Sequence, residues 1–261
     1  MIEDYIELGI KKVNNKKINM FILGILAGLF IGLASLLATV CSYTLTGSIA
    51  KVLAGLVFPI GLSLVVLFKT ELFTGNSLLV IPLLDKKIKL KQLLLNWLIV
   101  YLGNLVGSFL LALLIYLSGI ITKNQELGIS LINIAINKTT LTFTNAIILG
   151  SFCNILVCAS IYLCSSLKTI SEKIMVIFLS VFMFVALGFE HSVANMYYLI
   201  TGLFLKFDTG LMQRAMELKL NIDVLNVKTV ICSNLWPVTI GNIIGGTLLG
   251  FILWYIFKKR R

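Results

Sequence analysis

The distribution of apolar residues constrains this chain more than any other feature of its sequence. Long apolar segments cover roughly residues 20–42, 52–84, 93–121, 142–165, 174–205 and 229–257. A helix needs about 20 apolar residues to cross the hydrocarbon core of a bilayer. Lipid offers no partner for backbone N–H and C=O groups, so such segments span as helices. The sequence therefore predicts an all-α integral membrane protein with six transmembrane helices in a single membrane domain, residues 1–261.

Composition supports this class and excludes others. Hydrophobic residues make up 59% of the 261 residues and charged residues only 13%, whereas about a quarter of an average soluble domain is charged. The net charge of +11 does not indicate nucleic-acid binding, because the lysines cluster beside apolar segments rather than forming a basic stripe. The five cysteines form no CxxC pair, so no disulfide framework, metal site or cofactor is predicted.

The lysines and arginines predict the orientation in the membrane. Fourteen of them lie in the N-terminal segment, the loops after the second and fourth spans and the C-terminal tail, and seven lie in the other loops. Basic residues favour the cytoplasmic side. Both termini are therefore predicted to be cytoplasmic, in a multi-pass protein of the cell (inner) membrane. Residues 1–19 are expected to form a short amphipathic helix on the cytoplasmic membrane surface.

An internal repeat divides the chain into two halves. Polar residues interrupt the second and fifth spans, as "KTELFTGN" at 69–76 and "GFEHSVAN" at 188–195. Both share E-x4-N, and the third and sixth spans share N-x6-G-N-x-x-G, beginning at Asn96 and Asn234. Three spans in each half give the halves opposite orientations. We therefore expect an inverted repeat, residues 20–121 and 142–257, as in many channels and transporters.

The interrupted spans predict a site near the middle of the membrane. A break in lipid is tolerated only where it is buried in protein or lines a cavity, and half-helix N-termini favour anions. Glu71 and Glu190 are either proton relays or acceptors for free N–H groups of their own broken helices. We favour the second role, since both positions match across the repeat, as do Asn76 and Asn195. His191, the only histidine, is a functional candidate, because it is ionisable at membrane depth.

Five segments of this sequence resemble the formate/nitrite transporter family, which also includes hydrosulfide channels and lactate–proton transporters. They are "ELFTGN", "GFEHSVANM", "NWLIVYLGNLVGS", "GSFCNILVC" and "NLWPVTIGNIIGG". The resemblance covers residues from about 20 to 257. It implies an aquaporin-like fold, a homopentamer and one pore per protomer.

The resemblance also implies roles for individual residues. His191 matches the central pore histidine, Thr74 a threonine whose hydroxyl faces it, Lys138 a lysine that attracts the anion, and Asn154 an asparagine within the fourth span. The residues matching hydrophobic constrictions are Phe58, Leu62, Leu72, Phe73, Val157 and Phe184. Lys69 departs from the small residue expected in many members. We expect the Lys69 side chain to extend toward the membrane surface, to pair with Glu71 or to add positive potential at a pore mouth.

Several functions remain open at this stage. The leading hypothesis is a channel for small monovalent anions or their weak acids, with hydrosulfide or formate ahead of nitrite. The alternatives are a proton-coupled monocarboxylate or anion transporter on the same scaffold and a neutral-solute, aquaporin-like channel, although no NPA repeat is present. One histidine and no HExxH motif give no basis for an enzyme. The expected partners are small inorganic or organic anions, further copies of the chain and the bilayer.

Overall fold

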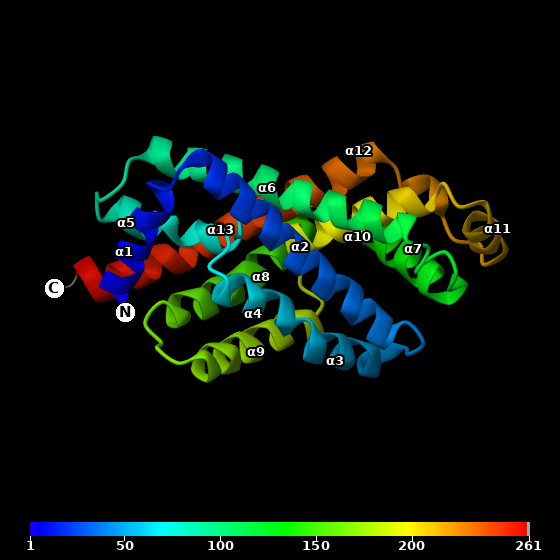
Figure 1. Ribbon diagram of the computed structural model, residues 1–261, viewed down its shortest axis with the longest axis horizontal. Helices are drawn as coiled ribbons and strands as arrows, with labels where there is room; N and C mark the ends of the chain where they lie inside the picture. The colour runs from blue at the N-terminus through cyan, green and yellow to red at the C-terminus, as the bar shows by residue number, and fades with distance from the viewer. Residues whose placement is uncertain (260–261) are drawn as a thin grey trace.

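The computed structural model, which describes residues 1–259, is a bundle of helices with no strand among these residues (Figure 1). By length and composition, five helices in this part of the chain are able to cross a membrane. They are α2 (Lys17–Ser42), the continuous pair α3 (Gly47–Val57) and α4 (Pro59–Leu67), α6 (Leu90–Leu117), α8 (Phe143–Cys164), and the stretch Val227–Lys258 that contains α13 (Trp236–Trp254). Arg260 and Arg261, which enter the charge count, lie outside the described residues.

The second and fifth apolar segments are interrupted where the sequence predicts. After α4, the chain resumes as the short helices η1 (Gly75–Leu79) and α5 (Val80–Leu84). The fifth segment consists of α9 (Ile170–Ala186) and α10 (Ser192–Leu205). The second segment still contributes a long helix through α3 and α4. The fifth does not, because α9 and α10 have only 17 and 14 residues, which accounts for the difference between six predicted spans and five long helices.

Both interruptions begin with the same turn. Lys69 has a φ of 53° and Gly188 a φ of 73°, and both therefore adopt the left-handed conformation. The next N–H in each case reaches back five residues, from Thr70 to Val65 at 3.0 Å and from Phe189 to Phe184 at 2.9 Å. This is the Schellman arrangement that ends a helix. The two breaks are therefore equivalent in backbone geometry, although glycine fills the left-handed position in only one.

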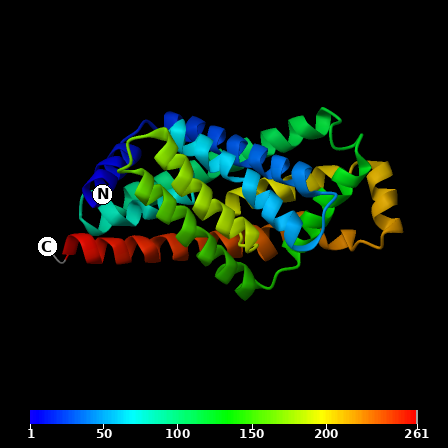
Figure 2. The ribbon, with the colours of Figure 1, turned by 90° about the horizontal axis from the view of Figure 1, so that it is seen from below.

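The two halves of the bundle run in opposite directions. In Figure 1, α2 and α6 lead away from the end that carries both termini, whereas α8 and α13 lead back toward it. Figure 2 also shows both chain ends together. We call that end of the bundle the terminus side and the other end the opposite side. These directions agree with the inverted repeat predicted from the sequence.

Glycines allow close packing within each half. A Cβ at Gly28 of α2 would lie 2.2 Å from the carbonyl oxygen of Asn104 on α6. In the other half, a Cβ at Gly245 of α13 would lie 2.0 Å from the carbonyl oxygen of Ser151 on α8. Small residues let membrane helices approach closely. The two pairs α2–α6 and α8–α13 therefore form the frame that holds the breaks.

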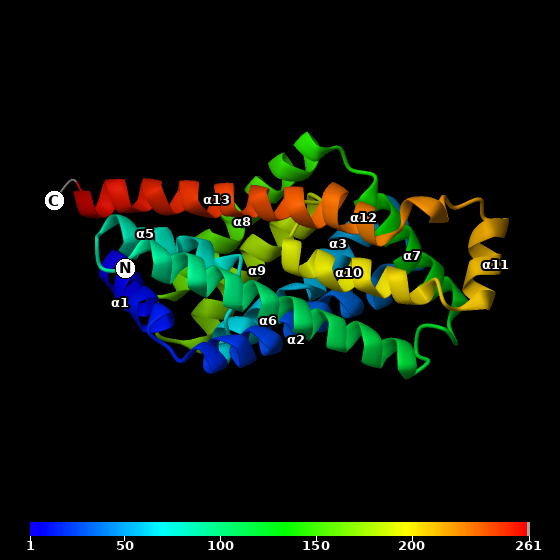
Figure 3. The same cartoon turned by 90° about the horizontal axis from the view of Figure 1, so that it is seen from above.

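Two shorter helices cover the ends of the bundle. On the terminus side, α1 (Ile2–Val13) buries Ile2, Tyr5 and Ile6 against the region of α5, so its apolar face contacts protein. On the opposite side lies α7 (Gln125–Thr139), as Figures 1 and 3 show. The remaining elements are α11 (Thr209–Glu217), η2 (Ile222–Val224), α12 (Val227–Thr229), the π-helical η3 (Val230–Leu235) and η4 (Tyr255–Lys259).

Candidate functional site

The two breaks meet in the interior through the residues predicted to face each other. Thr74 Oγ1 lies 2.9 Å from His191 Nε2, although the two residues are 117 positions apart. Thr74 is completely buried and His191 is 4% exposed. The structure therefore brings together one polar side chain from each half of the repeat.

The hydrogen bonds of His191 assign its tautomer. His191 caps α10, and its Nδ1 accepts a hydrogen bond from the backbone N–H of Ala194 at 3.1 Å. A ring nitrogen that accepts carries no hydrogen, so the hydrogen of the neutral ring is on Nε2. Nε2 therefore donates to Thr74 Oγ1. The hydroxyl hydrogen of Thr74 is consequently free to point at another acceptor.

A cavity reaches His191 from the opposite side of the bundle. Its volume is about 280 Å³, and its lining includes His191, Lys138, Glu190, Phe58 and Phe184. The rings of Phe58 and Phe184 meet edge to face at 5.9 Å, and the ring of Phe184 stacks on that of His191 at 6.0 Å. The cavity therefore combines a lysine near a carboxylate with an apolar wall beside the histidine.

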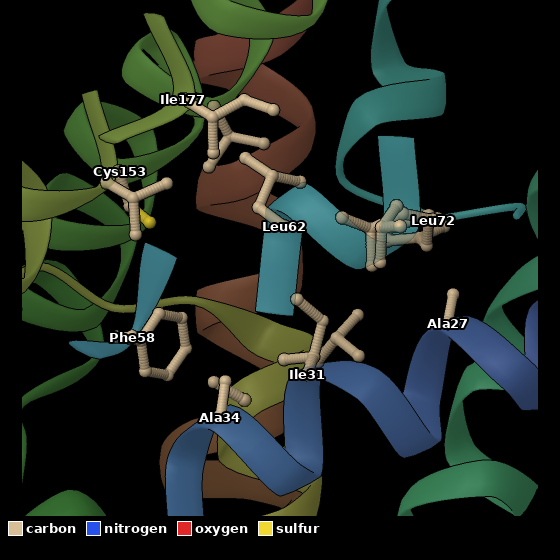
Figure 4. Close-up of a cluster of buried hydrophobic side chains, with 14 of the residues drawn as sticks. Ala27, Ile31, Ala34, Phe58, Leu62, Leu72, Cys153 and Ile177 are labelled. Carbon is tan, nitrogen blue, oxygen red and sulfur yellow. The ribbon is translucent and has the colours of Figure 1, made fainter. Parts of the chain in front are cut away.

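The other four predicted constriction residues lie deeper and do not line this cavity. Leu62, Leu72, Phe73 and Val157 are each 1–3% exposed and belong to the same apolar cluster as Phe58 and Phe184. Figure 4 shows Leu62 and Leu72 gathered with Phe58 near α2. An unpaired charge is costly in such surroundings. These four side chains therefore form part of an apolar interior that disfavours a bare charge.

A buried ion pair stands beside the break in the second half. Glu190 accepts hydrogen bonds from Lys138 Nζ at 2.9 and 3.0 Å and from Asn195 Nδ2 at 2.5 Å. Asn195 Nδ2 also donates to Asn234 Oδ1 at 2.8 Å. Lys138 is near the end of α7, so this network ties that helix to the break.

The same network recurs in the first half, with a lysine that the sequence analysis did not single out. Glu71 accepts from Lys12 Nζ at 2.8 Å and from Asn76 Nδ2 at 2.7 Å. Asn76 Nδ2 donates to Asn96 Oδ1 at 2.8 Å. Lys12 is the penultimate residue of α1, just as Lys138 is of α7. These matching contacts make α1 the counterpart of α7. The only sequence feature that pointed to Lys12 was its position beside the first apolar segment.

The free N–H groups at the breaks do not bind the glutamates, contrary to our expectation. The N–H of Phe73 donates to Asn104 Oδ1, and the N–H of Ser192 donates to Asn242 Oδ1, each at 2.9 Å. These asparagines belong to the two G-N-x-x-G motifs, which the sequence shows only as a repeat. Because an amide oxygen supplies the missing acceptor, the glutamates are left to pair with lysine.

Asn154 and Lys69 lie outside the opposite-side cavity. Asn154 Nδ2 donates to the carbonyl oxygens of Thr74 at 3.1 Å and of Asn242 at 2.6 Å, so it ties the first break to α13. Lys69 is exposed. It does not pair with Glu71, whose lysine partner is Lys12.

Comparison with known proteins identifies the family. The formate/nitrite transporter family matches residues 1–256. The chain belongs to this family. It is 38% identical over 260 residues to "Formate channel FocA" of Escherichia coli (strain K12), covering 97% of this chain and 91% of that protein.

Solved structures of family members share the fold. A "Pentameric formate channel with formate bound" superposes with a TM-score of 0.80 at 35% identity, covering 92% of this chain and 97% of that one. An "FNT family ion channel" gives a TM-score of 0.84 at 27% identity, covering 98% of each chain. Membership in this family places the protein among membrane transporters and channels rather than enzymes, as the sequence predicts.

Proposed function

We propose that this protein is a formate channel that assembles as a pentamer, with one pore in each protomer. The observation that carries the proposal is the Thr74–His191 pair, which joins the two breaks beside a cavity lined by Lys138. The names of a 38% identical relative and a pentameric neighbour support formate and the assembly. The lysine count supports a cytoplasmic terminus side.

The hydrogen bonds give Thr74 and His191 different tasks. His191 Nε2 donates to Thr74, which fixes that hydroxyl so that its own hydrogen is available to an anion oxygen. Protonating His191 on Nδ1 would break the cap that His191 provides by accepting from the N–H of Ala194. We therefore assign His191 a positioning role and Thr74 the direct hydrogen bond. This assignment favours a channel over a transporter whose proton passes through the histidine.

An anion that enters from the opposite side meets Lys138 before that hydrogen bond and the apolar rings after it. The positive charge of Lys138 offsets the negative charge of Glu190. The ammonium group of Lys138 has three N–H donors, so it can also contact an anion in the cavity. Beyond it, the apolar constrictions oppose a bare charge, so they favour an anion that spreads its charge over two oxygens and keeps a hydrogen bond to Thr74 as it passes. Chloride, whose charge is on a single atom, is disfavoured on this ground.

Flux into proteoliposomes tests the proposal. Formate, hydrosulfide, nitrite and chloride are compared for the wild type, Thr74→Val and Thr74→Ser. We expect selective formate flux that Thr74→Val reduces and Thr74→Ser preserves, because serine retains the hydroxyl. Equal flux with valine and serine would contradict the role of the hydroxyl. Selective flux of another anion, or none above empty vesicles, would contradict formate as the substrate.

The reversal potential separates a channel from a coupled transporter. In planar bilayers with a formate gradient, a channel gives a reversal potential that follows the formate gradient alone. Coupling to protons would make it follow a pH gradient as well. The second result would overturn the assignment of His191 as a positioning residue.

A further inference from the structure

Lys69 occupies a backbone position that does not suit a lysine. It is the left-handed residue that ends α4, with a φ of 53°. A side chain is strained in this conformation, which glycine adopts freely. Its counterpart at the other break is Gly188, with a φ of 73° and the same pattern of hydrogen bonds around it. Strain of this kind, kept at a functional site, is a reason to ask what the side chain does.

The counterpart indicates where the side chain of Lys69 projects. Gly188 lines the opposite-side cavity, and a Cβ built there would meet no atom within 4 Å. A side chain at position 188 would therefore enter the mouth of the pore. Because the two turns are related by the inverted repeat, the side chain of Lys69 extends toward the mouth on the terminus side. Consistent with this, Lys69 is exposed.

The charge of Lys69 is not neutralised by a neighbour. Among the salt bridges and side-chain hydrogen bonds within residues 1–259, none involves Lys69. Lys12, on the same side, is paired with Glu71, just as Lys138 is paired with Glu190 on the other. Lys69 therefore adds a positive charge for which its counterpart at the other break, Gly188, has no equivalent.

We propose that Lys69 is an anion-collecting residue at the terminus-side mouth, which lowers the formate concentration that half-saturates flux from that face. The inference rests on the proposed function. A positive charge at a pore entrance raises the local anion concentration, and salt screens the effect. A passive pore has the same limiting permeability in both directions. Lys69 therefore changes where flux saturates from its own face and not the direction of net flow.

The test uses membrane vesicles of both orientations, assigned by protease access to a C-terminal tag. Lys69→Gly is compared with Lys69→Arg and with Lys86→Gly. Lys86 is a matched control, because it is an exposed lysine with a φ of 57° in the loop after α5, between the second and third apolar segments. One charge within about 6 Å of the anion path in water changes the local anion concentration by about threefold.

We expect Lys69→Gly to raise the half-saturating formate concentration at the terminus-side face about threefold in low salt. The difference should vanish in about 0.5 M salt, where the Debye length is only a few ångströms. Lys69→Arg and Lys86→Gly should resemble the wild type. The thermal stability of Lys69→Gly should equal or exceed that of the wild type, which shows that the change in flux does not come from misfolding.

A mirror variant completes the test. Gly188→Lys should lower the half-saturating concentration at the opposite-side face by a similar factor. Equal shifts from Lys69→Gly and Lys86→Gly, or a shift that salt does not alter, would overturn the proposal while leaving formate transport intact. Wild-type vesicles without formate flux in either orientation would instead overturn the proposed function, and this inference with it.

Discussion

The Lys138–Glu190 pair allows a quantitative prediction about stability. The two side chains are only 16% and 9% exposed, and two N–O distances of about 3 Å join them. Lys138→Met leaves the Glu190 carboxylate buried without a cation. Removing one partner of a buried pair typically costs about 3–5 kcal/mol, whereas replacing both by neutral groups is often nearly neutral. Lys138→Met/Glu190→Gln should therefore be more stable than Lys138→Met by about 3 kcal/mol.

Thermal unfolding in detergent, followed by tryptophan fluorescence, measures the effect. For a chain of this size, 3–5 kcal/mol corresponds to a fall in Tm of about 6–20 °C for Lys138→Met. Arg214→Met is the control, because the Arg214–Glu217 pair is about half exposed and such pairs contribute about 1 kcal/mol or less. The reasoning would be refuted if the double variant were no more stable than Lys138→Met, or if Arg214→Met lowered the Tm as much as Lys138→Met does.

Three further predictions concern the cap, the helix contact and the constriction. His191→Asn should be more stable than His191→Ala by about 1 kcal/mol in thermal unfolding, because asparagine is a favoured cap that replaces the acceptor for the Ala194 N–H; equal stability would argue against the cap. Gly245→Ala should cost about 3 kcal/mol by the same assay, because its Cβ would lie 2.0 Å from a backbone oxygen of α8. Gly210→Ala, whose Cβ has its nearest neighbour at 3.4 Å, should change little. Phe58→Ala should raise chloride flux relative to formate in proteoliposomes, and unchanged selectivity would show that this ring is no barrier.

The membrane segments could be predicted because lipid imposes a rule that acts along the sequence. Length and apolarity locate the helices, and polar runs within them locate the breaks at Lys69 and Gly188. The paired motifs likewise predicted two related halves. These features depend on local order in the chain, so they needed no knowledge of three-dimensional contacts.

The contacts at the site were harder to predict, since they join distant residues. Thr74 and His191 came together in the sequence analysis only through the family resemblance. Lys12 was treated as a topology signal, because nothing in its spacing shows that it reaches Glu71. Asn104 was recognised only as part of a repeated motif, because sequence does not reveal which N–H group its amide will meet. The transport roles of these residues stay predictions until flux is measured.

The spacing of these contacts along the chain has a consequence for biosynthesis. Chains are made from the N-terminus, and Lys12 and Glu71 are separated by 59 positions, whereas Thr74 and His191 are separated by 117. The first half can therefore neutralise its buried glutamate while the second half is still being synthesised. The pore pair has to wait until the fifth apolar segment has been inserted. The passage thus forms on a scaffold whose first break already holds its counter-charge.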